Sequence, residues 1–80
     1  MDKKHALDHI NAALQTAIKD PKASAKPGTD LREDGILDSL DGLVFLMELT
    51  ASTGKSFPEK DLEALGFFKV DKLIEYLTTE

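Results

Sequence analysis

The chain has 80 residues, 41% of them hydrophobic, so we expect one domain, residues 1–80, with a hydrophobic core. It contains no cysteine, so neither disulfides nor a cysteine-built zinc site can stabilise that core. The absence of cysteine also excludes a thioester on any of its own side chains. The formal net charge of −5 disfavours nucleic acid as a partner. The N-terminus, residues 1–6, lacks the apolar run of a signal peptide, and the longest apolar run, residues 43–47, is too short for a membrane span, so we expect a cytoplasmic monomer.

The first predicted helix is Lys3–Ile18, with Asp2 as its N-cap. Pro21 lies just beyond its end, where a proline commonly stops a helix. The apolar side chains recur at the i, i+3/i+4, i+7 spacing of an amphipathic helix and form one narrow stripe, made of Leu7, Ile10, Leu14, Ala17 and Ile18.

A long connection, residues 19–37, follows this helix. Connections of this length are uncommon in compact domains and are usually functional or mobile. We expect three apolar residues, Leu31, Ile36 and Leu37, to anchor it to the core. Acidic residues are concentrated in residues 30–48, from the second half of this connection into the helix that follows. This range contains Arg32 and six acids, so its net charge is −5, which favours basic partners. The acids are Asp30, Glu33, Asp34, Asp38, Asp41 and Glu48.

The second predicted helix is Ser39–Thr53, followed by Gly54 as the C′ residue. Asp38 is a good N-cap, and Asp41 three positions later makes an aspartate variant of the capping box. Ser39 then falls in the first turn, where its hydroxyl stays accessible and the helix macrodipole favours negative charge. A serine held in this way is suited to modification by another protein, although capping alone is the more ordinary role.

Apolar residues occupy two opposed stripes of this second helix. One consists of Leu40, Leu43, Val44 and Met47, and the other of Phe45, Leu46 and Leu49, with Asp41 and Glu48 on an edge between them. A surface helix needs only one such stripe, so either the helix is buried on both sides or one stripe is a docking surface. We favour docking, because so short a chain has little else to cover both. Gly42 costs about 1 kcal/mol relative to alanine and indicates a close helix approach, room for a chain or simple tolerance.

Two further helices are predicted in the remaining sequence. Residues 59–65 follow Pro58 and form a short helix that ends at Gly66. Residues 70–77 form the last helix, with a single apolar stripe. The predicted fold class is therefore all-α, a small four-helix bundle with a long loop between its first two helices and a short third helix.

From about residue 31 to 77, the sequence resembles the acyl carrier proteins of fatty acid and polyketide assembly. The resemblance rests on the acidic stretch 34–41, which contains the Asp38-Ser39-Leu40 core, on the apolar helix behind it, on Phe57-Pro58-Glu59 and on the closing helix. The first helix fits by position and pattern only.

The resemblance implies that Ser39 carries 4′-phosphopantetheine, attached by a phosphopantetheinyl transferase, with Asp38 and Leu40 beside it. The terminal thiol of that arm would hold an acyl group as a thioester and deliver it among acyl-loading and acyl-transfer enzymes. The chain itself would not be an enzyme. By the same resemblance, the acyl chain would enter an apolar interior, and candidates for lining it are Phe45, Leu46 and Leu49, which serve equally well as ordinary core residues. From the docking stripe and its acidic edge, we expect partners to bind Leu40, Asp41, Leu43, Val44, Met47 and Glu48.

One departure from the family concerns the second helix. Carriers of primary fatty acid synthesis usually have several acids along it, whereas this helix has Val44, Thr50 and Ala51 on the corresponding face and retains Asp41 and Glu48. We therefore favour a specialised carrier of lipid or polyketide metabolism that recognises its partners through the apolar stripe.

Several alternatives remain open. Within carriers, a D-alanyl or other aminoacyl carrier uses the same arm. From other classes, an acidic helical adaptor fits the composition, and Asp30, Asp34, Asp38 and Asp41 match part of a calcium-binding loop, although Arg32 stands at a ligand position. His5 and His9 have the spacing of a metal pair but only Asp2 or Asp8 to assist them. Autonomous catalysis by Ser39 is disfavoured, because no histidine lies in its segment.

Overall fold

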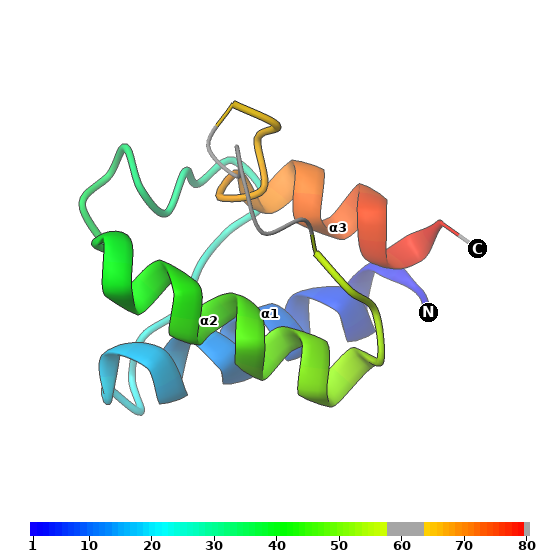
Figure 1. Ribbon diagram of the computed structural model, residues 1–80. Coiled ribbons are helices and arrows are strands. Elements are labelled where there is room, and N and C mark those ends of the chain that lie inside the picture. Colours follow the sequence, from blue (N-terminus) through cyan, green and yellow to red (C-terminus); the bar gives the residue numbers. More distant parts are fainter. Residues whose placement is uncertain (58–63, 80) are drawn as a thin grey trace.

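The computed structural model describes residues 1–57 and 64–79, and within them it contains three helices and no strand. Helix α1 spans Lys3–Ile18, α2 spans Ser39–Thr53 and α3 spans Val70–Thr78. Helix α1 packs against both of the others, with α2 along one side and α3 along another (Figure 1). The described part of the chain is therefore a small all-α domain.

The ends of α1 and α2 are set by local capping, and their predicted bounds are confirmed. The Asp2 carboxylate accepts a hydrogen bond from His5 N at 2.8 Å, and the Asp38 carboxylate accepts one from Asp41 N at 2.7 Å. Gly54 caps the C-terminal end of α2 and has the left-handed φ of 76° that glycine adopts without strain. Helix α3 runs one residue beyond the predicted end, to Thr78.

The core lies where the three helices meet. Each helix contributes one buried stripe, and burying an aliphatic side chain of this kind stabilises the fold by about 1.5–3 kcal/mol. Among the largest fully buried side chains are Ile10 and Leu14 of α1, Phe45 and Leu49 of α2, and Leu73 and Leu77 of α3.

The long loop between α1 and α2 is fixed to the helices along its length. Its predicted anchors Leu31 and Leu37 are buried, and Ile36 is half-buried against the same core. Two side chains of α1 hold its first half: Asn11 Oδ1 accepts a hydrogen bond from Ala25 N at 2.8 Å, and Gln15 Nε2 donates one to the Ala23 carbonyl at 3.0 Å.

The second half of the loop is joined to the segment that leads into α3. Asp30 and Lys69 form an isolated antiparallel bridge. Beside it, Leu31 N donates to the Phe68 carbonyl at 2.7 Å, and Val70 N donates to the Thr29 carbonyl at 2.9 Å. This bridge brings the approach to Ser39 against residues nearly forty positions later in the chain.

The expected four-helix bundle is found only in part. Most of the predicted helix 59–65 lies outside the described residues, and its last two positions, Ala64 and Leu65, belong to a turn that continues to Phe68. Gly66, with φ of 78°, lies within that turn. In the part of the chain that is described, no helix has the length and apolar character needed to cross a membrane.

Candidate functional site

Ser39 is the first residue of α2 and its side chain is exposed. The cap of the helix is supplied by Asp38, whose carboxylate accepts from Asp41 N, so the hydroxyl of Ser39 is not needed for capping. That hydroxyl instead accepts a hydrogen bond from Arg32 Nη1 at 3.2 Å. A guanidinium group therefore lies directly beside the predicted modification site.

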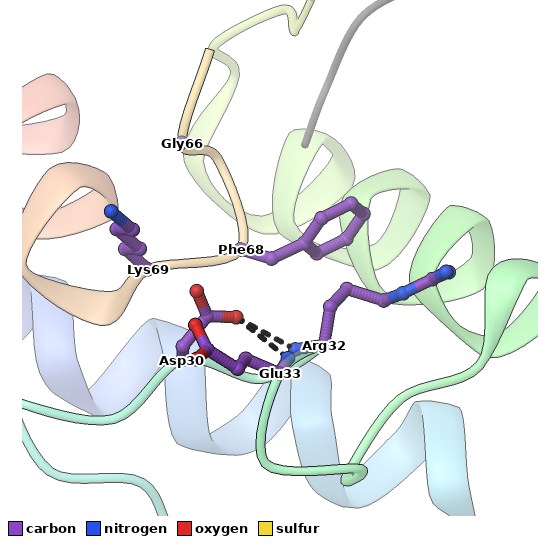
Figure 2. Close-up of a pocket in the computed structure, with 6 residues that line it drawn as sticks. All are labelled: Asp30, Arg32, Glu33, Gly66, Phe68 and Lys69. Atoms are coloured by element: carbon purple, nitrogen blue, oxygen red, sulfur yellow. Dashed lines mark hydrogen bonds between the residues drawn. The ribbon is translucent and has the colours of Figure 1, made fainter. Parts of the chain in front are cut away.

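The guanidinium of Arg32 is held by an aromatic ring from the segment before α3, which the bridge between Asp30 and Lys69 joins to the loop. Its guanidinium lies over the Phe68 ring, 5.7 Å from the ring centroid, which is within the range of a cation–π interaction. Figure 2 shows the two side chains extending alongside each other, with Phe68 coming from the segment before α3. The Phe68 ring is almost fully buried.

Gly42, one turn into α2, explains how Phe68 fits. A Cβ atom at this position would lie 3.0 Å from both Cε1 and Cζ of the ring, closer than ordinary van der Waals contact. The absence of a side chain at Gly42 therefore allows the Phe68 ring to pack directly against α2. Of the explanations considered for Gly42, close approach is the one that the packing supports, although the partner is a ring of a connecting segment and not a neighbouring helix.

The backbone around Arg32 is also fixed. Asp30 Oδ1 accepts hydrogen bonds from Arg32 N at 3.0 Å and from Glu33 N at 2.9 Å, the two dashed lines in Figure 2. A cavity of about 410 Å³ opens between this turn and the opposite segment, lined by Asp30, Arg32, Glu33, Gly66, Phe68 and Lys69. Both acidic and basic side chains therefore line this cavity.

The two apolar stripes of α2 have different surroundings. On the predicted partner-binding stripe, Leu40 is 70% exposed, Leu43 is 51% exposed and Met47 is 71% exposed. Val44 differs from them, because it is half-buried and packs against the core. The possibility that α2 is buried on both sides is therefore excluded, and the exposed stripe consists of Leu40, Leu43 and Met47.

The opposite stripe is part of the core. Phe45, Leu46 and Leu49, the residues predicted to line an acyl pocket, are all buried among side chains of the other helices. In this arrangement they act as core residues. The two acids at the edge of the helix differ in exposure: Asp41 is half-buried and Glu48 is exposed.

The carboxylates proposed for a calcium loop do not gather into a ligand set. Among residues 1–57 and 64–79, no three His, Cys, Asp or Glu side chains are grouped as they would be around a metal ion. Asp30 and Asp38 use side-chain oxygens to accept backbone N–H groups. The two histidines of α1 also have separate contacts, His5 Nδ1 with Asp2 at 3.1 Å and His9 Nδ1 with Ser52 Oγ at 3.1 Å.

The sequence correctly predicts the Asp38 cap and three of the four residues of the exposed stripe, but it does not indicate that Arg32 contacts Ser39 or that Phe68 packs against Arg32. The one hint in the sequence is Gly42, whose missing side chain indicates that something packs closely there. Comparisons of the chain with models of protein families, with curated proteins and with solved structures gave no match.

Proposed function

We propose that the protein is an acyl carrier protein that is modified with 4′-phosphopantetheine on Ser39. The observation that carries the proposal is the pairing of an exposed serine at the start of α2 with an exposed apolar stripe that begins at the next residue. A modifying enzyme must reach the hydroxyl and recognise the surface around it. Leu40, Leu43 and Met47 supply apolar contact area for that recognition.

The surroundings of Ser39 are compatible with a phosphodiester. Its hydroxyl faces solvent, so an attached group does not have to enter the core. Arg32 Nη1 lies at hydrogen-bond distance from Ser39 Oγ and offers positive charge in a segment that is otherwise acidic. When attached, the arm supplies a thiol that can hold an acyl group as a thioester, a bond that no side chain of this cysteine-free chain can form.

The attachment is a phosphoryl-group transfer from coenzyme A. Ser39 Oγ attacks the phosphorus atom that bears pantetheine and forms a new P–O bond. The P–O bond to the second phosphate breaks, so that adenosine 3′,5′-bisphosphate leaves, and the hydroxyl proton passes to a base of the transferase. The chain contributes the nucleophile and its position, and the transferase contributes the catalysis.

Intact mass after incubation with coenzyme A and a phosphopantetheinyl transferase tests this proposal. We expect one addition with the mass of phosphopantetheine. Ser39→Ala should abolish it, whereas Ser24→Ala, which removes another exposed serine from the long loop, should leave it unchanged. An addition that survives Ser39→Ala, or no addition to the unmodified sequence, would show that Ser39 is not such a site.

The cargo follows from which enzyme loads the arm. We propose an acyl group of fatty acid, lipid or polyketide biosynthesis in the cytoplasm, with the small number of acids on α2 favouring a specialised set of partners. An aminoacyl carrier uses the same serine, and charging the modified protein with either an acyl-loading or an aminoacyl-loading enzyme distinguishes the two.

A further inference from the structure

We propose that Arg32 is a positioning residue that binds the phosphate group attached to Ser39. The proposal rests on the function proposed above and goes beyond it, because it gives the phosphate a binding partner on the carrier itself. The anchoring contact comes from the loop, seven residues before the serine.

The first observation is the distance between the two side chains. Arg32 Nη1 donates to Ser39 Oγ at 3.2 Å, and Oγ is the atom that becomes bonded to phosphorus. The non-bridging oxygens of that phosphate are therefore only two bonds from an atom that the guanidinium already contacts. Arginine also presents several N–H donors in a planar fork, a geometry that matches phosphate oxygens.

The second observation is that the guanidinium is held in place. Phe68 supports it through the cation–π contact, and the ring is itself held against Gly42 of α2. The backbone N–H of Arg32 is fixed by the Asp30 carboxylate. An arginine restrained at both its backbone and its guanidinium loses less side-chain freedom when it binds a ligand than a mobile surface lysine does.

The third observation concerns charge. Arg32 is the one basic residue within positions 30–48, which also contain six acids. Asp38 and Asp41 flank Ser39 at the start of α2 and repel a phosphodiester. A cation fixed at the serine hydroxyl opposes this repulsion where the phosphate is attached.

The test compares three variants in the full chain. Arg32→Gln removes the charge and the fork, Arg32→Lys keeps the charge, and Lys26→Gln is the matched control, because it removes one exposed cation from the same loop. Two quantities are measured: kcat/KM for the transferase by intact mass, and the ³¹P chemical shift of the attached phosphodiester after complete modification.

We expect Arg32→Gln to lower kcat/KM by about tenfold or more, the loss typical of a hydrogen bond to a charged group. Lys26→Gln should change it by less than about twofold, since exposed surface substitutions away from special contacts have small effects. We expect the ³¹P resonance to move in Arg32→Gln and to stay in place in Lys26→Gln. Arg32→Lys should lie between the unmodified sequence and Arg32→Gln in both measurements.

Each contrary result has a distinct meaning. If the protein without substitutions gains no phosphopantetheine, the proposed function fails and this inference fails with it. If the protein without substitutions gains phosphopantetheine and Arg32→Gln leaves the ³¹P resonance in place, Arg32 does not bind the phosphate, and the proposed function stands. A slower reaction with an unmoved resonance would assign Arg32 to transferase contact and overturn the inference. If Arg32→Gln has a much lower melting temperature, Arg32→Lys replaces it in the test. An unmoved ³¹P resonance in Arg32→Lys would then overturn the inference.

Discussion

The two faces of α2 carry the same kind of side chain in opposite surroundings. On the inner face, Phe45 and Leu49 are completely buried. On the outer face, Leu40 and Met47 keep about 70% of their surface in contact with solvent. Since both sets belong to one helix with the same two caps, the helix itself does not require the outer residues to be apolar.

This difference separates residues that maintain the fold from residues available to a partner. A single exposed leucine is ordinary in a soluble protein, but three large apolar side chains on successive turns of one helix form a patch. The patch begins directly after Ser39. Its position therefore links it to the serine, and not to the core on the other side of the helix.

The largest expected effect comes from truncating the inner face. Leu49→Ala should lower the free energy of unfolding by about 2–5 kcal/mol, because it removes a fully buried side chain and leaves a cavity. Urea denaturation followed by circular dichroism measures the change. If Leu49→Ala costs no more than Leu43→Ala, the two faces do not differ as described.

A smaller effect is expected at the start of the helix, which both faces share. Asp38→Ala removes the side chain that accepts from Asp41 N and should cost about 1 kcal/mol of stability. Asp38→Asn keeps a capping oxygen and serves as the control. Equal losses in the two variants would mean that the charge of Asp38, and not its cap, supports the helix.

Gly42→Ala tests the contact between α2 and Phe68. Alanine is favoured over glycine inside a helix by about 1 kcal/mol, but its Cβ would press on the buried ring, so the two effects oppose each other. We expect a net change in stability of less than about 1 kcal/mol, together with a clear shift of the Phe68 ring resonances in the NMR spectrum. Unshifted ring resonances would show that the ring does not rest on Gly42.

The smallest change in stability is expected on the outer face. Leu43→Ala should alter the free energy of unfolding by no more than about 0.5 kcal/mol, since the side chain is half exposed. In the same variant, we expect kcat/KM for the phosphopantetheinyl transferase to fall. A variant that is fully stable and is modified at the original rate would argue against the outer face as a docking surface.

Much of this architecture could be predicted because its determinants are local. Asp2, Asp38 and Gly54 mark helix ends through contacts with residues three or four positions away, and these give the bounds of α1 and α2. The apolar periodicity separates the faces of α2, with one exception. Helical spacing places Val44 on the outer face, but this residue is half-buried, since spacing alone does not tell how far the core extends around a helix.

The surroundings of Ser39 could not be predicted because they depend on distant contacts. Arg32 and Phe68 meet only after the bridge between Asp30 and Lys69 aligns the loop with the segment before α3. No periodic pattern encodes that alignment. The same is true of Lys55, whose ammonium group donates to the Tyr76 and Thr79 carbonyls and so joins the end of α2 to the end of α3.

Arg32 is the only arginine in the chain. Its Nε–H group therefore gives a single resonance in a region of the ¹⁵N spectrum that no other side chain of this protein occupies. Because the guanidinium lies 5.7 Å from the centroid of Phe68, the ring current of that aromatic side chain acts on this resonance. The packing of one ring against one cation thus provides a natural spectroscopic reporter at the serine, which responds to any group attached there without an added label at the site.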